Sequence, residues 1–191
     1  MNQININTPL GIRDRAMLET FYSTGIRRAE LANLCLRDLD KTRGMLMVRQ
    51  GKGLKDRSIP IGERAMLWIE KYLDEVRATV LDNPREEHLF LTMRGKPISA
   101  NGLSELVGEY IRKAGYKGVG SCHIFRHTMA TLMLEAGADI RFIQKMLGHE
   151  RLSTTQIYTQ VSDKKLKDVH STTHPGAKLF PNTITKEDSQ D

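Results

Sequence analysis

Four residues that could do chemistry fall in two short clusters in the second half of the sequence. His123 and Arg126 lie three residues apart within HIFRH, and His149, at the end of LGH, is followed nine residues later by Tyr158. Positions three apart share one face of a helix, so His123 and Arg126 are aimed into one place. An imidazole can move a proton near neutral pH and a guanidinium stays charged, so this pair suits acid–base work beside an anion.

The surrounding sequence predicts the helices that hold these residues. One apolar stripe at helical spacing consists of Phe125, Met129, Leu132 and Met133. Asp139 can cap the next helix and Gly148 suits the left-handed residue that ends it, which fixes His149 at a helix terminus. The buried face between these two caps would be Ile140, Ile143, Met146 and Leu147. Ser153 suits the cap of a further short helix that carries Tyr158 toward the cluster.

Three other kinds of site fit the sequence less well. His123 and His127 have the spacing of a zinc pair, but no Glu follows the first His and no third ligand is evident nearby. The glycines beside Lys52 lack the G-x-x-x-x-G-K-[ST] spacing of a phosphate-binding P-loop. A Ser-His-Asp triad lacks its G-x-S-x-G elbow. We therefore expect neither a metal nor a cofactor.

The first half of the sequence predicts two helices and a hairpin. Residues 10–24 carry apolar side chains at helical spacing and end at Gly25, and a second helix runs from about 28 to 35 with Arg27 at its start. Segments 45–50 and 57–61 read as strands, and GKGLKD between them suits a turn. This predicts a β-hairpin with Lys52 at its tip.

Two more helices and a strand follow before the central stretch. A long amphipathic helix is predicted over residues 62–81, a short third strand over 89–92, and another helix from Ser99 or Asn101 to near Gly115. The apolar face of the long helix would consist of Met66, Leu67, Ile69, Leu73 and Val76.

Composition is compatible with one ordinary globular domain that has a polyanionic partner. The chain has 191 residues, of which 39% are hydrophobic, and a net charge of +6. It holds no window of about 18 uncharged apolar residues, and its first residues form neither a basic start nor an apolar signal core. We expect a cytoplasmic, nucleoid-associated protein without a membrane segment.

The motifs taken together resemble one enzyme family. HIFRH, then LGH, then a tyrosine nine residues on, is similar to the catalytic C-terminal half of tyrosine recombinases, the phage-integrase and Xer group. Upstream, STGIRRAEL around Arg27 and GKGLKDRSIPI around Lys52 resemble the other two catalytic boxes in the same order. The resemblance spans about residues 8–169. It implies an α+β, mainly helical tyrosine-recombinase catalytic fold with a small antiparallel β-sheet.

The resemblance also implies a DNA breaking and rejoining reaction. Arg27 and Arg126 would hold the non-bridging oxygens of a phosphodiester, where negative charge grows during attack. Tyr158 would be the nucleophile and form a 3′-phosphotyrosine link to DNA, which stores the energy of the broken bond and makes ATP unnecessary.

The remaining catalytic positions of the family would move protons. His123 would be the general base, because a tyrosine with a pKa of about 10 is mostly protonated at neutral pH. Lys52 would protonate the departing 5′-oxygen as general acid. His149 would donate a hydrogen bond to the phosphate or hold its neighbours in place.

Five further basic residues flank the hairpin or a turn and are candidate contacts to double-stranded DNA. They are Arg49, Lys55, Arg57, Arg94 and Lys96. Phosphate contacts of this kind make affinity fall steeply with salt and carry little sequence information.

The expected organisation is a flexible leader over residues 1–9, the catalytic domain over 10–174 and a disordered tail over 175–191. Family members usually carry an N-terminal domain that clamps the other side of the DNA, and the resemblance covers their catalytic half; a natural short recombinase and a part of a longer one stay open as alternatives. We expect a site-specific recombinase or integrase of a mobile element or chromosome-maintenance system. It would be a homotetramer on DNA, with a monomer as the alternative when free. A type IB topoisomerase-like enzyme and a non-catalytic DNA-binding protein retaining the fold stay open as alternatives.

Overall fold

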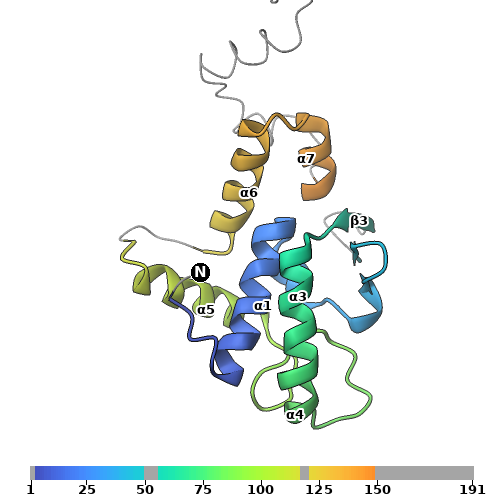
Figure 1. Cartoon of the computed structure of the whole chain (residues 1–191), viewed down its shortest axis with the longest axis vertical. Helices are drawn as coiled ribbons and strands as arrows, with labels where there is room; N and C mark the ends of the chain where they lie inside the picture. The colour runs from blue at the N-terminus through green and yellow to red at the C-terminus, as the bar shows by residue number, and fades with distance from the viewer. Residues whose placement is uncertain (1–2, 50–55, 117–120, 149–191) are drawn as a thin grey trace, which may run out of the picture.

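The computed structural model describes residues 3–49, 56–116 and 121–148. Helices α1 (Pro9–Thr24) and α3 (Glu63–Tyr72) pack side by side at the centre of this part of the chain, with a small sheet on one side and helix α5 (Ala100–Lys113) on the other (Figure 1). Helices α6 (His123–Glu135) and α7 (Ile140–Leu147) lie together at one end. The expected mainly helical α+β architecture is confirmed.

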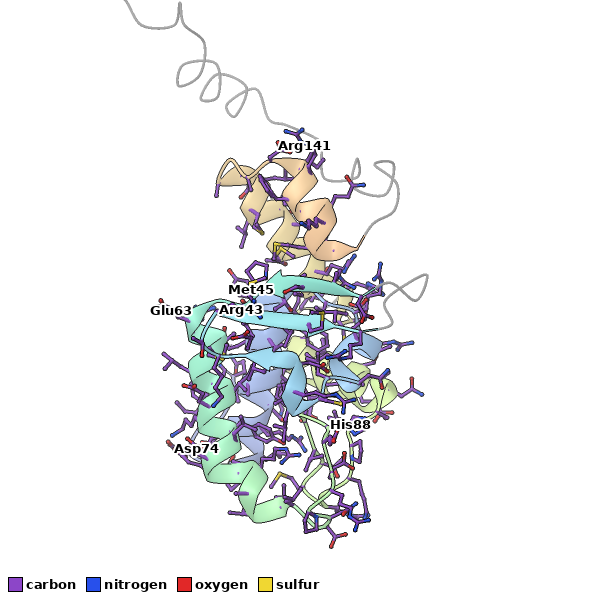
Figure 2. All side chains as sticks on the ribbon, turned by 90° about the vertical axis from the view of Figure 1, so that its right-hand side faces the viewer. Arg43, Met45, Glu63, Asp74, His88 and Arg141 are labelled. Atoms are coloured by element: carbon purple, nitrogen blue, oxygen red, sulfur yellow. The ribbon has the colours of Figure 1, made fainter. Side chains whose placement is uncertain are left out.

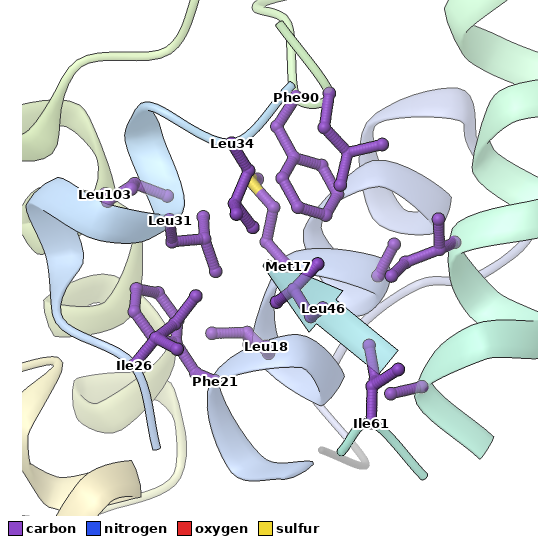
Figure 3. Packing of buried hydrophobic residues seen from close by; sticks show 14 of the residues in the cluster. Met17, Leu18, Phe21, Ile26, Leu31, Leu34, Leu46, Ile61, Phe90 and Leu103 are labelled. Carbon is purple, nitrogen blue, oxygen red and sulfur yellow. The ribbon is translucent and has the colours of Figure 1, made fainter. Parts of the chain in front are cut away.

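Helix α1 forms where the sequence predicts it and supplies the centre of the core. Thr8 Oγ1 accepts a hydrogen bond from the Gly11 backbone N–H at 3.1 Å, and Gly25 ends the helix in the left-handed region at φ 61°. Met17, Leu18 and Phe21 are at most 2% exposed. Figure 3 shows these side chains packed toward others from the segment after α1, from the sheet and its end, from the segment before α5 and from α5 itself; those labelled are Ile26, Leu31, Leu34, Leu46, Ile61, Phe90 and Leu103.

The sheet has three antiparallel strands in the order β1-β2-β3, namely β1 (Leu39–Asp40), β2 (Met45–Val48) and β3 (Arg57–Pro60). Strands β2 and β3 form the predicted hairpin, in which Val48 faces Arg57. The prediction of a third strand over residues 89–92 was wrong. Leu91 makes only an isolated bridge to Pro97, and its backbone N–H donates to the Tyr72 hydroxyl at 2.9 Å.

The long helix predicted over residues 62–81 is a continuous helical path of three pieces. Helix α3 passes into a π-helical segment, η2 (Leu73–Arg77), and then into α4 (Ala78–Val80). Its buried face differs from the prediction, because Ala65, Ile69, Tyr72 and Val76 are at most 2% exposed whereas Leu67 is 65% exposed. The residues at i, i+4, i+7 and i+11 face α1, and Leu67 lies on the opposite side of the helix.

The remaining elements agree with the predicted caps. Ser99 Oγ accepts from Gly102 N–H at the start of α5, and Asp139 accepts from Arg141 N–H at the start of α7, which Gly148 ends at φ 63°. Two short elements complete the described part, α2 (Arg28–Ala32) and the 3-10 turn η1 (Leu36–Asp38). Figure 2 shows the α6–α7 pair, marked by Arg141, at one end of the molecule and the segment around His88 toward the other.

The described part of the expected leader makes specific contacts. Ile4 is only 7% exposed and belongs to the core cluster. The Asn5 carbonyl accepts from the Thr8 hydroxyl at 3.0 Å, next to the start of α1. The expected tail over residues 175–191 lies outside the described residues.

Candidate active site

Arg126 is placed by helix α6 against the end of helix α7. Its side chain comes from a helix face that it shares with buried Met129 and Ala130, and it is 6% exposed. Nη1 donates to the Gly25 carbonyl at 2.8 Å and Nη2 donates to the Leu147 carbonyl at 2.6 Å. Arg126 therefore ties the end of α1 to the last turn of α7.

Arg27 reaches the same place from another element. It is the N-cap residue of α2 with an extended backbone, and its side chain is 26% exposed. Nη1 donates to Glu30 Oε1 at 2.8 Å and Nη2 donates to the Gly148 carbonyl at 3.3 Å. The predicted catalytic arginines Arg27 and Arg126 thus contact neighbouring carbonyls, and the structure brings them together.

A third arginine joins them from the hairpin. Arg57 begins β3, and its side chain is 12% exposed. Nε donates to the Met146 carbonyl at 2.9 Å, and Nη1 and Nη2 donate to the two Glu30 oxygens at 2.9 and 2.8 Å. This planar, two-bond geometry is the arrangement in which a guanidinium binds a carboxylate most specifically.

We call Arg27, Arg57 and Arg126 the arginine cluster. They come from α2, β3 and α6, and they donate in turn to Gly148, Met146 and Leu147, three successive carbonyls at the end of α7. Figure 1 shows β3 beside this end of α7. A helix C-terminus carries partial negative charge and unpaired carbonyls, so cations are stabilising there. The cluster fixes the point from which the chain continues to His149.

Glu30 is the carboxylate that pairs with Arg27 and Arg57 of the cluster. It is 8% exposed. Although burial opposes ionisation, hydrogen bonds from the Arg57 side chain and the Arg27 backbone N–H lower the pKa of Glu30 to about 2. Glu30 is therefore ionised at neutral pH, and together with Arg27 and Arg57 it carries a net charge of about +1.

Among the site residues that the structure describes, Arg27 and His123 are the accessible ones. His123 is the first residue of α6 and is exposed, one turn before Arg126. Arg27 keeps about a quarter of its side chain exposed, whereas Arg57 and Arg126 are held largely inside. The arrangement presents fixed positive charge beside an exposed imidazole, which suits stabilisation of an anion and transfer of a proton.

Three of the predicted catalytic residues and one predicted DNA contact lie outside the described residues. They are Lys52, His149, Tyr158 and Lys55. Arg49 is half exposed and bound to Asp38 at 2.5 Å, Lys96 is exposed and bound to Asp82 at 3.0 Å, and Arg94 is exposed on the same turn. Roles of these residues in DNA binding stay predictions.

Sequence reasoning missed Glu30 and the contacts of Arg57. The available signal for Glu30 was its position, three residues after Arg27 at the start of a helix, where a glutamate can accept from the N-cap backbone N–H. Glu30 Oε2 does accept from Arg27 N–H at 2.8 Å. Arg57 looked like an exposed cation of the hairpin, and its distant partners left no local signal.

The described residues contain no group of three or more His, Cys, Asp or Glu side chains arranged to hold a metal ion. Among the same residues, no helix is both long and apolar enough to cross a membrane.

Comparison with known proteins gives a consistent result. Residues 1–165 match the Phage integrase family. The chain is 49% identical over 184 residues to the tyrosine recombinase XerC 2 of Ralstonia nicotianae, covering 96% of this chain and 52% of that protein. It is 40% identical over 176 residues to the tyrosine recombinase XerD of Oceanobacillus iheyensis, covering 92% and 59%. The chain thus spans between half and three-fifths of the length of these relatives.

Solved structures have the same fold. A XerA recombinase aligns with a TM-score of 0.72 at 33% identity, over 86% of this chain and 59% of that one. A XerH site-specific recombinase bound to its difH substrate aligns with a TM-score of 0.73 at 25% identity, over 89% and 49%. The predicted tyrosine-recombinase catalytic fold is confirmed.

Proposed function

Because the chain belongs to the phage integrase family, we propose that it cleaves and rejoins DNA strands as the catalytic part of a site-specific tyrosine recombinase. The observation that carries the proposal is the arginine cluster, in which Arg27 and Arg126 are held at one helix end beside exposed His123. Phosphoryl transfer requires fixed cations at that kind of place, because negative charge develops on the non-bridging oxygens.

The reaction assigns a step to each predicted residue. Arg27 offers its exposed edge to the scissile phosphate, and the buried charge of Arg126 strengthens the positive field from behind. Tyr158 attacks phosphorus and its proton passes to His123. The bond to the 5′-oxygen breaks, and Lys52 supplies the proton that this oxygen takes. His149 donates to the phosphate.

The same scheme runs backwards to rejoin strands. A 5′-hydroxyl from another strand gives its proton to the neutral Lys52 amine as it attacks the 3′-phosphotyrosine, and the tyrosine leaves with the proton held by His123. Because the phosphotyrosine conserves the phosphoester bond, no ATP is consumed. Lys52, His149 and Tyr158 enter this scheme from the sequence resemblance.

The proposed partner is double-stranded DNA, and the proposed working form is a homotetramer on DNA. The relative whose structure is described as bound to difH substrate supports DNA as partner. The net charge of +6 is compatible with phosphate contacts, and we expect the affinity to fall steeply between low and physiological salt.

The experiment is capture of the covalent intermediate with the 191-residue chain. DNA duplexes of randomised sequence carry a nick, so that the short strand released by cleavage diffuses away and traps the protein on DNA. Adducts are recovered under denaturing conditions and sequenced. Tyr158→Phe is the matched variant, because it removes only the attacking hydroxyl.

We expect an adduct with the unchanged chain and none with Tyr158→Phe. An adduct that persists in Tyr158→Phe would show that another residue is the nucleophile. DNA binding without any adduct would favour the non-catalytic DNA-binding protein. Relaxation of supercoiled plasmid without strand exchange would favour the topoisomerase-like enzyme.

A further inference from the structure

We propose that Arg57 is a positioning residue for strand cleavage, which acts through Glu30 to hold the Arg27 guanidinium at the end of α7. The inference rests on the proposed function for its reaction and on the described contacts for its geometry. It replaces the simpler interpretation of Arg57 as an exposed contact to DNA phosphate.

The first step of the argument is that Arg57 already has protein acceptors. Its side chain is 12% exposed, two of its nitrogens bind both oxygens of Glu30, and the third binds the Met146 carbonyl. A Cβ atom added at Gly148 would lie 3.1 Å from Arg57 Cζ, so the backbone of α7 packs closely against the guanidinium. Arg57 could reach a phosphate only by leaving these partners.

The second step is that Glu30 divides its carboxylate between two arginines. Oε1 accepts from Arg27 Nη1 at 2.8 Å and from Arg57 Nη1 at 2.9 Å, and Oε2 accepts from the Arg27 backbone and from Arg57 Nη2, both at 2.8 Å. Arg57 thus supplies most of the side-chain neutralisation of Glu30. Without it, the buried carboxylate would depend on Arg27 alone.

The third step concerns the charge that remains for a substrate. With Arg57 in place, the group of two arginines and one glutamate has a net charge of about +1, and Arg27 is its exposed member. Without Arg57 the remaining pair is close to neutral, and the attraction of Glu30 draws Arg27 inward. The field at the phosphate weakens and the geometry of Arg27 changes, although Arg57 never touches DNA.

The chain contains a matched control for this arrangement. Glu19, which is 1% exposed, also lies between two arginines, Arg15 Nε at 2.8 Å and Arg64 Nε at 2.9 Å. This second group joins α1 to α3 and contacts no residue of the arginine cluster in the described contacts. Arg64→Ala therefore removes an arginine from a buried glutamate without touching the proposed site.

The experiment measures both the environment of the Arg27 side chain and the rate of DNA cleavage. The side-chain Nε–H signal of Arg27 is followed by NMR in the unchanged chain, in Arg57→Ala, in Arg57→Lys and in Arg64→Ala. Single-turnover adduct formation at saturating nicked DNA and the DNA dissociation constant are measured for the same proteins. Circular dichroism checks folding, and Arg57→Lys, which keeps the charge and loses the fork, serves where Arg57→Ala does not fold.

We expect Arg57→Ala to shift or broaden the Arg27 signal and to slow cleavage about 10- to 100-fold at saturation, with at most about a threefold change in DNA affinity. Arg57→Lys should recover part of the rate, and Arg64→Ala should leave both readings unchanged. Adding Glu30→Gln to Arg57→Ala should slow cleavage no further, because the two residues act through one contact.

Two results would overturn the inference. One is an unchanged Arg27 signal in both folded Arg57 variants. The other is a loss of DNA affinity with an unchanged rate at saturation, which would mark Arg57 as a direct phosphate contact. Absence of any adduct with the unchanged chain would overturn the proposed function instead, and the Arg27 signal would still decide whether Arg57 positions Arg27.

Discussion

Two groups in the described part of the molecule each consist of one glutamate that lies between two arginines, and the two groups have different surroundings. Arg15, Glu19 and Arg64 join α1 to α3, where Arg15 also lies 5.3 Å from the centre of the Trp68 ring. Arg27, Glu30 and Arg57 join α2 to β3 and donate onward to the carbonyls that end α7. The arginines of the first group also contact aromatic rings, whereas those of the second group also donate to backbone carbonyls at the candidate site.

Exposure separates the two groups further. In the first, Arg64 is the outer arginine with 60% of its side chain exposed, and it is stacked 5.4 Å from the Tyr22 ring. In the second, both arginines are largely inside, and the more exposed one is Arg27 at 26%. The same combination of two arginines and one glutamate therefore joins two helices in the first group and presents a cation in the second. Function is decided by what the arginines contact beyond the glutamate.

The largest expected difference between the groups is in cleavage. Arg27→Ala removes a donor from the phosphate and should slow adduct formation about 100- to 1000-fold, equivalent to about 2.7–4 kcal/mol of transition-state stabilisation. Arg15→Ala, at the corresponding place in the other group, should leave the rate within about twofold. Single-turnover assays on nicked DNA measure both. Equal rates for the two variants would remove Arg27 from the site.

The next largest effect is on stability at acid pH. The pKa of Glu30 is about 2 in the folded protein and near 4.5 when unfolded, so its contribution is complete above about pH 4.5 and is lost as pH falls toward 2. This linkage is worth at most about 3 kcal/mol. Glu30→Gln should therefore narrow the difference in unfolding free energy between pH 6 and pH 3.

Urea unfolding at the two pH values measures this linkage. Glu109→Gln is the control, because Glu109 pairs with Lys113 on the exposed face of α5. Other carboxylates contribute equally to the variant and the unchanged chain, so they cancel in the comparison. An identical pH dependence in Glu30→Gln and the unchanged chain would mean that Arg57 and Arg27 do not stabilise the ionised form.

A smaller effect on stability and cleavage is expected from substitution of Gly148, where the end of α7 packs against Arg57. Gly148→Ala places a Cβ at a residue with φ 63° and 3.1 Å from Arg57 Cζ, whereas Gly44→Ala has φ 61° but its nearest neighbour is the Ile61 carbonyl at 3.6 Å. Both substitutions should cost about 1–2 kcal/mol from the backbone conformation. Only Gly148→Ala should also slow cleavage, because it displaces Arg57. Thermal melts on both variants measure the loss of stability, and adduct assays measure the loss of cleavage. Equal cleavage rates in the two variants would show that Gly148→Ala does not displace Arg57.

The contacts among Arg27, Glu30 and Arg57 could not be predicted from the sequence, for a physical reason. The caps and terminal glycines of α1, α5 and α7 are local signals, and the hairpin has its own alternation and turn, so these elements were predictable. Arg57 is 27 residues from Glu30 and 89 from Met146, and only the folded chain brings them together. Arg126 is predicted from its spacing to His123, and Arg27 through the family resemblance.

The errors had similar origins. Leu67 was assigned to the buried face of α3, because an apolar side chain does not reveal which side of its helix will be covered. Strand β1 has only two residues, too few to produce an alternating pattern, whereas the apolar run at residues 89–92 is typical of a strand. In both cases the answer depended on packing partners distant in the sequence.

The smallest expected effect tests whether exposure, rather than pairing, sets the importance of an arginine. Arg64→Ala leaves Glu19 with Arg15, and solvent can reach the place where Arg64 stood, since its side chain is 60% exposed. Because the Arg64 guanidinium lies mostly in water and Arg15 still pairs with Glu19, the unfolding free energy should fall by no more than about 1 kcal/mol. The Arg57 side chain is only 12% exposed, so Arg57→Ala removes a buried partner that water does not readily replace, and it should cost about 3–5 kcal/mol by the same urea titration. A loss for Arg64→Ala as large as that for Arg57→Ala would show that any arginine beside a buried glutamate matters equally, and the distinction between the two groups would then rest on cleavage alone.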